Sequence, residues 1–449
     1  MDARQLTLEV LLEMEKSSTY ANGLIKDVLD KYDYEDQRDK AFFKRLTENT
    51  LERRITLDWV LNCFSKTPVE KMKPLIRNLL RLSACQILYM DNIPDSAACN
   101  EAVKLAKRRG FSSLSGFVNG VLRTIAKNKD NLQWPDQTKE PIRYLSVFYG
   151  LPEWILKLWE EQYGMEVLKK KLPFMADKRP VTLRFKENLS EKELAAVMMS
   201  FSENGIEAKK HPYFETAWEL GSFEGVTSLP GFEEGQFYVQ DVSSMLAVTA
   251  AGIVPGMQVI DLCSAPGGKA VLACEKLQGT GMLRAGDVSA NKTDKIRENA
   301  QRMGCTNMEI SIWDATVTNE ENLNWADVML ADVPCSGLGV MGRKKDIRYR
   351  VTRQDLDSLA KLQKEIITAS WQYVKPGGVL LYSTCTVDRL ENEKMVKFIT
   401  DNFPFETDSL DDYLPAQLAD EQTKQGMLQL WPGEHKTDGF FLARLRRIK

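Results

Sequence analysis

Apolar residues recur at helical spacing through the first 130 residues. Leu6, Val10 and Met14 lie four residues apart and therefore fall on one face of a helix. The same periodicity runs through 41–64, 74–90 and 114–125. Because one-sided apolar faces are stable only when they are buried against each other, residues 1–130 are predicted to form an all-α bundle.

The pattern changes after a polar, proline-containing segment at 128–142. A short helix is predicted to begin at Pro152, and the alternating apolar residues of 181–185 predict a strand. A helical stretch at 190–205 follows, and the segment GQFYVQD is again extended in character. We therefore expect a small α+β domain over 143–235.

From residue 236 onward, strand-like apolar runs alternate with helical stretches. In chain order, the strand candidates are QVIDLC, MLRAGD, MEISI, DVMLAD, GVLLYST and GFFLARL. This alternation is typical of a doubly wound α/β sheet, so 236–449 is predicted to form a Rossmann-like domain. In such sheets, ligands bind at the carboxyl ends of the strands. The acidic stretch at 401–421 is interpreted as a solvated insertion.

The composition narrows the choice of chemistry. No apolar run approaches the roughly 18 residues that a membrane helix needs, and the N-terminal residues lack the pattern of a signal peptide. Eight cysteines are scattered without a CxxC pair, so we expect reduced thiols and a cytoplasmic location. We also expect a monomer. Because His211 and His435 are the only histidines, zinc is disfavoured and catalysis should rest on carboxylates, lysines or thiols.

Positive charge is concentrated in the predicted helical domain. Residues 1–130 hold 22 Lys and Arg against 18 Asp and Glu, although the whole chain has a net charge of −3. One basic cluster comprises Lys66, Lys71, Lys73, Arg77 and Arg81, and a second comprises Lys104, Lys107, Arg108, Arg109, Arg123, Lys127 and Lys129. Such clusters either contact nucleic-acid phosphates or form a solvated helix face, and charge alone does not decide between the two.

Several acidic residues follow the predicted strands of the α/β domain. The first strand ends in Asp261 and turns through two glycines, which permit close backbone approach, into a helix whose free N-terminal amides suit an anion. Asp287 lies where a carboxylate can accept hydrogen bonds from ribose hydroxyls. Acids around one pocket suit a ligand with hydroxyls, an adenine and a positive centre, and S-adenosyl-L-methionine has all three. The residues assigned to this cofactor are Asp261, Cys263, Ser264, Ala265, Pro266, Gly267, Gly268, Lys269, Asp287, Asp314 and Asp332.

Two cysteines follow neighbouring predicted strands. Cys335 lies in ADVPCSG and Cys385 in YSTCT, so both are expected over the same crevice as the cofactor. A single cysteine is more often a small buried apolar residue. We interpret Cys63, Cys85, Cys99, Cys274 and Cys305 in that way.

The motifs DLCSAPGGK, DVPCSG, YSTCT and DGFFLARL, in this order, resemble those of the RNA (cytosine-5)-methyltransferases, the Sun family. The resemblance covers about 236–449 and extends back through GQFYVQDVSS. The N-terminal helices resemble the NusB antitermination fold, and the middle domain is RNA-recognition-like. A combination of this kind is similar to bacterial enzymes that methylate small-subunit (16S) rRNA.

The resemblance implies a covalent mechanism that yields 5-methylcytosine in single-stranded or flipped cytidine. It assigns the nucleophile to Cys385 and product release to Cys335, with Asp332 on the cytosine edge and Lys269 near the nucleophile. Ser264 replaces a usual alanine. Gly342 and Lys345 replace a usual arginine and proline in a loop that we expect near the RNA.

Three alternatives remain open from the sequence. A related enzyme could act on tRNA or on another rRNA cytosine. A NusB-type RNA-binding assembly factor without catalysis is a different class, although intact Asp261, Asp332, Cys335 and Cys385 argue against it. DNA as the substrate is disfavoured because the second cysteine and the helical domain would then have no role.

Overall fold

The computed structural model divides the chain into two compact units, which are described separately. Unit 1 comprises 1–172 and 343–350, and unit 2 comprises 173–342 and 351–449. The residues described are 2–17, 21–31, 37–176, 179–223 and 225–449. The three domain ranges expected from the sequence remain a prediction. None of the described helices combines the length and apolarity that a membrane span requires.

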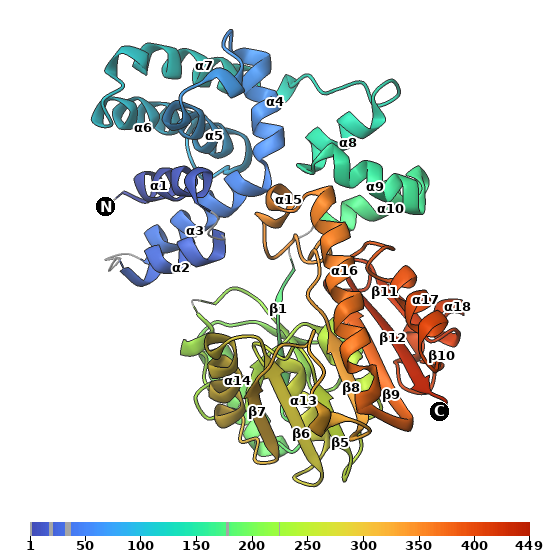
Figure 1. Cartoon of the computed structure of the whole chain (residues 1–449). Coiled ribbons are helices and arrows are strands. Elements are labelled where there is room, and N and C mark those ends of the chain that lie inside the picture. Colours follow the sequence, from blue (N-terminus) through green and yellow to red (C-terminus); the bar gives the residue numbers. More distant parts are fainter. Residues whose placement is uncertain (1, 18–20, 32–36, 177–178, 224) are drawn as a thin grey trace. The chain divides into compact units, whose positions relative to one another are not determined.

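The regular secondary structure of unit 1 is helical in its described part (Figure 1), and for 1–130 this confirms the predicted all-α bundle. Its helices are α1 (Ala3–Lys16), α2 (Ala21–Lys31), α3 (Gln37–Glu52), α4 (Arg54–Phe64), α5 (Pro74–Tyr89), α6 (Asp95–Arg108), α7 (Ser115–Asn128), α8 (Pro141–Tyr149), α9 (Glu153–Tyr163), α10 (Met165–Ala176, up to Leu172) and α15 (Ile347–Arg350). The periodic stretch at 41–64 spans two helices, which meet at Arg53. Almost every residue of α5 from Asn78 to Ile87 is buried, so α5 is the central helix of the bundle.

The segment 343–350 belongs to unit 1 although it lies far along the chain. The Lys345 ammonium pairs with the Glu52 carboxylate at 2.8 Å, and Arg348 Nη1 donates to the Gly150 carbonyl at 3.2 Å. Burial lowers the pKa of Lys345, and the charge of Glu52 opposes this shift. The sequence predicted this loop near the substrate RNA. That contact with RNA stays a prediction. In the structure, the charged groups of Lys345 and Arg348 contact Glu52 and Gly150 of the helical unit.

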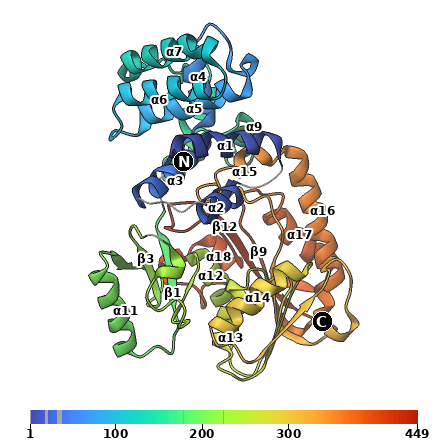
Figure 2. The ribbon, with the colours of Figure 1, turned by 90° about the vertical axis from the view of Figure 1, so that its left-hand side faces the viewer.

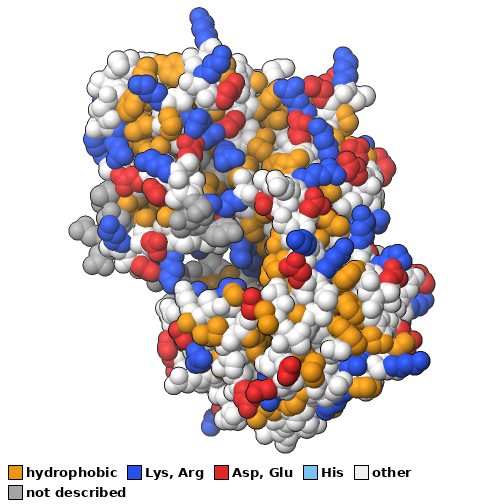
Figure 3. Space-filling view, viewed as in Figure 1, with side chains coloured by type: hydrophobic (Ala, Val, Ile, Leu, Met, Phe, Trp, Pro, Cys, Tyr) orange, Lys and Arg blue, Asp and Glu red, His pale blue; other side chains and the backbone are white. Residues whose placement is uncertain are grey.

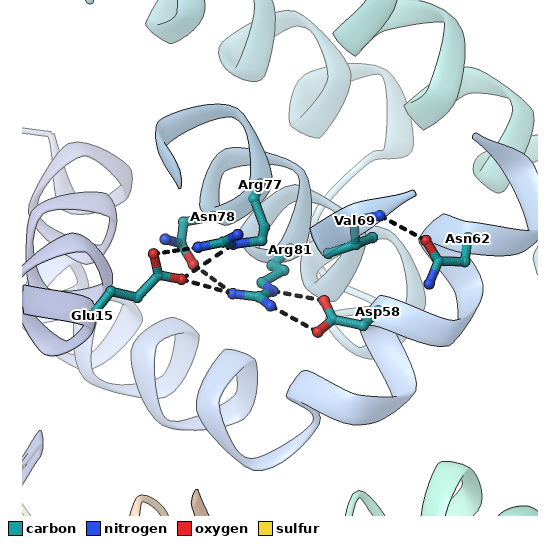
Figure 4. Close-up of polar contacts among 7 residues, drawn as sticks. All are labelled: Glu15, Asp58, Asn62, Val69, Arg77, Asn78 and Arg81. Carbon is teal, nitrogen blue, oxygen red and sulfur yellow. Dashed lines mark hydrogen bonds and ion pairs between the residues drawn. The ribbon is translucent and has the colours of Figure 1, made fainter. Parts of the chain in front are cut away.

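A buried arginine joins three helices of unit 1 (Figure 4). Arg81 of α5 donates two hydrogen bonds of 2.7 Å to Asp58 of α4, and a third of 3.1 Å to Glu15 of α1. Arg77 also pairs with Glu15, at 2.6 Å. Burial raises the pKa of Glu15, but hydrogen bonds from Arg77 and Asn78 and the charges of both arginines outweigh burial and lower it. The sequence placed Arg77 and Arg81 in a basic cluster. In the structure, both arginines form ion pairs with acidic residues of other helices in unit 1.

Replacing Arg81 with methionine is expected to lower the free energy of unfolding of unit 1 by about 2 kcal/mol. The apolar stem is kept, but Asp58 loses both of its hydrogen bonds from Arg81. Urea denaturation of the full chain would measure the change. The matched control is Lys71→Met, because Lys71 is exposed and makes no ion pair with a described residue. Equal midpoints for the two variants would show that the Arg81 network contributes no net stability.

The remaining basic residues of the two clusters differ in their partners. Lys104 pairs with Glu101, Lys129 with Asp95 and Arg109 with Glu9. Lys66, Lys71, Lys107 and Lys127 are exposed and form no ion pair with a described residue. On the face shown in Figure 3, basic side chains of the helical unit lie scattered among apolar and acidic ones. Lys73, Arg108 and Arg123 are exposed as well. These seven residues are the members of the clusters that are exposed and outside the ion pairs of the described residues, and they can therefore reach a nucleic acid.

Unit 2 contains the predicted doubly wound sheet. Among the described residues, eight strands form this sheet in the order β10-β12-β9-β8-β5-β6-β7, with β11 paired to β12. The strands are β5 (Gln258–Asp261), β6 (Met282–Asp287), β7 (Met308–Ile312), β8 (Ala326–Asp332), β9 (Val374–Thr384), β10 (Phe405–Thr407), β11 (Met427–Leu430) and β12 (Phe440–Arg447). The strands β5 to β9 are parallel, and β10, β11 and β12 are antiparallel additions at one edge. The parallel order reverses between β5 and β8, where such folds bind their ligands.

Both faces of the central strands are buried, which explains their continuous apolar sequences. In β8, Val328 and Leu330 pack into one core and Met329 and Ala331 into the other. The first core also receives α12 (Val242–Ala250) and α13 (Gly268–Lys276), and the second receives α16 (Arg353–Ser370) and α17 (Glu393–Asn402). Figure 1 shows α13 and α14 (Ala290–Arg302) with β5 to β7, and α16 beside β8. The Rossmann-like prediction is confirmed.

A second, four-stranded antiparallel sheet precedes the large one. Its order is β2 (Ala208–Lys210), β3 (Ala217–Leu220), β1 (Val181–Phe185) and β4 (Phe237–Val239). One face packs on α11 (Glu191–Glu203), as Figure 2 shows. On the other face, the buried Arg184 donates to Gln240 at 2.7 Å and pairs with Glu275 of α13. Arg184 therefore ties this face of the small sheet to α13, and Gln240, which follows β4, reaches the turn between β5 and α13.

The interpretation of 401–421 as a solvated insertion is wrong. Leu410, Leu414 and Leu418 are buried in the first core, and β10 extends the large sheet. Asp408, just outside β10, forms ion pairs with Arg444 and Arg446 of β12. Apart from the partly buried Asp408, the acidic residues of the segment are exposed. Its regularly spaced leucines indicated burial, and the charge count alone did not show this.

Candidate active site

A cavity of about 190 Å³ lies at the carboxyl ends of β5 and β8. Its lining residues are Tyr238, Val239, Gln240, Asp241, Ser244, Asp261, Cys263, Ser264, Ala265, Pro266, Gly268, Lys269 and Asp332. Eight of the residues assigned to the cofactor from the sequence are therefore brought together here. The strand order alone explains the location, because β5 and β8 flank the reversal of the parallel sheet.

The turn after β5 has the geometry that its glycines suggested. Gly267 has a φ of 106°, which favours glycine, and it immediately precedes α13. Its amide donates to the Ser264 carbonyl at 2.6 Å, which closes the turn. A Cβ atom on Gly268 would lie 3.1 Å from the ring of Tyr238, so the turn also packs tightly against β4.

Asp261 is the most unusual acid of the cavity. It is 1% exposed, and neither carboxylate oxygen accepts a hydrogen bond from a described residue. Burial raises its pKa to about 7, against the opposing charge of Lys269. A buried carboxylate without donors is uncommon in folded proteins, so it indicates that a donor from outside the chain is accepted in this cavity.

Two of the predicted cofactor acids have other roles in the structure. Asp287 accepts hydrogen bonds from the amides of Ala265 and Val288 at 3.1 and 2.8 Å, and Lys292 pairs with it at 2.8 Å. Asp287 thus fixes the β5–α13 turn. Asp314 is exposed and caps its own turn through the amide and hydroxyl of Thr316. Neither acid lines the cavity, so their contacts with a cofactor stay a prediction.

Asp332 and Lys269 form a partly buried ion pair on the cavity wall. Lys269 Nζ lies 2.7 Å from Asp332 Oδ2, and Ser383 donates to Asp332 Oδ1 at 2.8 Å. Burial lowers the pKa of Lys269, but the charges of Asp332, Asp261 and Cys385 outweigh it, so the net shift is upward. Lys269 therefore stays protonated and provides a fixed positive charge near Cys385.

The two cysteines of the strand ends are adjacent. Cys335 Sγ lies 3.0 Å from Cys385 Sγ, and the Cys385 amide donates to Cys335 Sγ at 3.3 Å. Both side chains are partly exposed and both are free thiols. The hydrogen bond with Cys385, burial and nearby carboxylates raise the pKa of Cys335. The raised pKa keeps the Cys335 thiol protonated, so Cys335 can donate its S–H to the sulfur of Cys385.

The thiols lie next to the cavity rather than in its wall, since neither is among the lining residues. Asp332 connects the two places, because it lines the cavity and accepts a hydrogen bond from Ser383, two residues before Cys385. The sequence expected one crevice for cofactor and thiols. The structure divides it into a cavity and an adjoining thiol pair.

The other cysteines follow the burial expected for apolar residues with two departures. Cys85, Cys99 and Cys274 are buried, whereas Cys63 is exposed and Cys305 is partly exposed. The interpretation of Cys63 as a buried apolar residue is wrong, because Phe64, and not Cys63, packs on the core at the last turn of α4. Within the described residues, no group of three or more His, Cys, Asp or Glu side chains is arranged to hold a metal ion.

Sequence reasoning missed the contribution of the β4–α12 turn. Tyr238, Gln240, Asp241 and Ser244 line the cavity, and Asp241 begins α12 by accepting a hydrogen bond from the Ser243 amide. The motif GQFYVQDVSS carried these residues, but nothing in its spacing indicated that they meet the β5–α13 turn. Gln240 does so directly, because its Nε2 donates to the Gly268 carbonyl at 3.1 Å.

Comparisons with known proteins cover the whole chain. Residues 250–446 match the family model "16S rRNA methyltransferase RsmB/F", and residues 1–127 match the model "NusB family". A Bacillus subtilis protein named "Probable ribosomal RNA small subunit methyltransferase B" is 36% identical over 450 residues, 99% of this chain and 98% of that protein. "Ribosomal RNA small subunit methyltransferase B" of Vibrio cholerae is 30% identical over 91% of this chain and 90% of that protein. The crystal structure of PH0851 covers 99% of this chain and 98% of that chain with a TM-score of 0.81; at 22% identity, this likeness concerns the fold.

Proposed function

Because the chain belongs to the RsmB/F family of rRNA methyltransferases, we propose that it methylates C5 of a cytosine in 16S rRNA through a covalent adduct with Cys385. The observation that supports the covalent scheme is the pair of sulfur atoms, 3.0 Å apart, beside the Lys269–Asp332 ion pair. The same scheme was expected from the motifs that carry the two cysteines.

The cavity fits S-adenosyl-L-methionine as the methyl donor. The orphaned Asp261 carboxylate suits the ammonium group of the ligand, and the N-terminus of α13 behind Gly267 and Gly268 suits its carboxylate. Cys263, Ser264, Ala265, Pro266, Lys269 and Asp332 complete the proposed binding residues, with Asp287 and Asp314 as further candidates. When bound, this cofactor supplies a methyl group on a positively charged sulfur.

The nucleophile is needed because C5 of cytosine does not accept a methyl group unaided. The Cys385 thiolate adds to C6, and the electron pair displaced toward C5 then attacks the methyl carbon. The bond between that carbon and the sulfonium sulfur breaks, its electron pair stays on sulfur, and S-adenosylhomocysteine would be the leaving group. Lys269 is proposed to orient the nucleophile and to provide a positive charge beside the attacking sulfur. Asp332 is proposed to contact the N3 and N4 edge of the base and to stabilise the charge that develops there.

Product release requires the C5 proton to leave and the bond between Cys385 and C6 to break. Once Cys385 is bound to C6, the interaction that most raises the pKa of Cys335 is removed. Cys335 can then lose its proton to solvent and accept the proton of C5. The electrons of the C5–H bond restore the double bond between C5 and C6, and those of the S–C6 bond return to Cys385.

The substrate is proposed from the relatives and from the helical unit. Mapping labelled methyl groups on rRNA from cells with and without the protein would test it directly. Loss of a single 5-methylcytosine from 16S rRNA is the expected result. Loss of a 5-methylcytosine from tRNA or from large-subunit rRNA would mean that the substrate is a different RNA and that the chemistry is the proposed one. Absence of methyl transfer to any RNA would favour an RNA-binding factor without catalysis.

Replacing Asp261 with asparagine is expected to weaken binding of S-adenosylhomocysteine by about 10-fold, because a charged hydrogen bond is lost. In the native protein the carboxyl is protonated below its pKa of about 7, so binding should weaken as the pH falls. From about pH 8 to about pH 6, we expect about a 10-fold loss of affinity. Lys269, Asp332 and Asp287 also face Asp261, so calorimetry of the Asp261→Asn variant is needed as the reference. A variant that keeps the native pH profile would exclude Asp261 as its source.

A further inference from the structure

The loop that carries Cys335 is held by hydrogen bonds to the peptide groups on both sides of this residue. Gln363 of α16 donates its side-chain amide to the Pro334 carbonyl at 2.9 Å. Glu391 accepts the amide of Ser336 on its Oε2 atom at 2.9 Å. The same amide group of Gln363 also donates to Glu391 Oε2, at 2.9 Å. One carboxyl and one amide therefore hold the peptide groups on either side of Cys335.

The side chain of Gln363 and the backbone of Glu391 also contact Tyr382 of β9, the strand that directly precedes Cys385. The Tyr382 hydroxyl donates to the Glu391 carbonyl at 2.7 Å and lies 3.2 Å from Gln363 Oε1. The hydroxyls of Ser336 and Thr386, each one residue after a thiol, lie 2.7 Å apart. The segments that carry the two thiols are thus held by the same group of buried residues.

Glu391 is a costly residue to bury. Glu391 and Gln363 are both 0% exposed, and Glu391 Oε1 has no hydrogen-bond partner among the described residues. An apolar residue in this place would avoid the desolvation of a carboxyl with an unsatisfied oxygen. Burial also raises the pKa of Glu391 to about 7, so the group carries only part of its charge near neutral pH. What the carboxyl provides that an apolar side chain cannot is the anchor for the Ser336 amide.

We propose that Glu391 is a positioning residue which, together with Gln363, holds the Cys335 thiol beside Cys385 for release of the covalent enzyme–RNA adduct. The inference rests on the proposed function. Without the anchor, Cys335 is displaced from the C5 proton, whereas Cys385 still forms its bond to C6. The defect is therefore expected in release and not in methyl transfer.

The test uses the full chain and measures three quantities: the rate of a single turnover, the rate of multiple turnover, and the amount of covalent protein–RNA adduct. For Glu391→Ala, we expect one round of methyl transfer at the native rate, multiple turnover lowered by about 100-fold, and a protein–RNA adduct that survives denaturation. A role in stability alone would lower the unfolding temperature without trapping RNA. Glu391→Gln keeps an oxygen for the Ser336 amide and should release its product like the native protein. Equal trapping by Glu391→Gln and Glu391→Ala would overturn the positioning role.

Two further variants sharpen the result. Glu393→Ala is the control, because Glu393 lies two residues from Glu391 and also has a pKa raised by burial, but its side chain is partly exposed and, among the described residues, it pairs with Arg389 at 3.5 Å rather than with the Cys335 loop. Gln363→Ala should trap adduct as well, and the double variant with Glu391→Ala should be no worse than either single one.

The failure of this inference differs from the failure of the proposed function. If Cys335→Ala traps an adduct but Glu391→Ala behaves like Glu393→Ala, the positioning role is wrong and the covalent scheme stands. If no variant ever traps RNA and Cys385→Ala still methylates, the covalent scheme itself is wrong.

Discussion

Replacing Cys385 with alanine is expected to lower methyl transfer to 16S rRNA by more than about 1,000-fold. Without the sulfur, no bond to C6 forms, and C5 remains too weakly nucleophilic to take the methyl group. Binding of S-adenosylhomocysteine should stay close to native, because Cys385 does not line the cavity. Transfer of tritium from labelled cofactor to an rRNA transcript would measure the rate, and calorimetry would measure binding.

The control for this variant is Cys63→Ala, which removes an exposed thiol from the helical unit. It should methylate at the native rate. A Cys385→Ala enzyme that keeps its activity and forms a stable adduct through Cys335 would show that the two roles are exchanged. Because the sulfur atoms are only 3.0 Å apart, this result decides which of the two thiols attacks C6. The raised pKa of Cys335 favours Cys385 as the nucleophile.

Replacing Cys335 with alanine is expected to have the second largest effect and an opposite signature. Methyl transfer should occur once, after which the enzyme stays bound to its product, because the group proposed to accept the C5 proton is absent. Turnover is expected to fall by about 100-fold or more, in the range found for loss of a general base. On a denaturing gel, a band of protein joined to labelled RNA should accumulate with time.

The control for trapping is the double variant that lacks both thiols. It should form no adduct, since the bond to C6 requires Cys385. Cys335→Ala with native turnover and no adduct would contradict the release role. In that case, the 3.0 Å contact between the sulfur atoms would serve only to hold a proton near Cys385.

Local patterns predicted much of the fold. The helices α1, α5 and α7, the strand β1 and the helix α11 all lie where the periodicity placed them. The strands β5 to β9 and β12 correspond to the six candidate runs. The short strands β2, β3, β10 and β11 were not predicted, because three or four residues give too little alternation to be distinguished from a loop.

Charge patterns were less informative than apolar ones. Arg77 and Arg81 looked like part of a nucleic-acid surface, but their partners Glu15 and Asp58 come from two other helices. A count of charges along the chain cannot show such pairing. The same applies to Asp408, which lies in an acidic stretch yet holds two arginines of β12.

The sequence by itself determined which residues can perform the chemistry. Asp261, Lys269, Asp332, Cys335 and Cys385 follow strands or open a helix, and parallel strands bring their carboxyl ends to one edge of a sheet. The tertiary structure decided how these groups are charged and held. Burial leaves Asp261 without a donor, the contact with Cys385 keeps Cys335 protonated, and Glu391 and Gln363 anchor its loop. Gln363 lies 29 residues from Pro334 and Glu391 lies 55 residues from Ser336, and contacts over such separations depend on how helices pack on the sheet, which local periodicity does not encode.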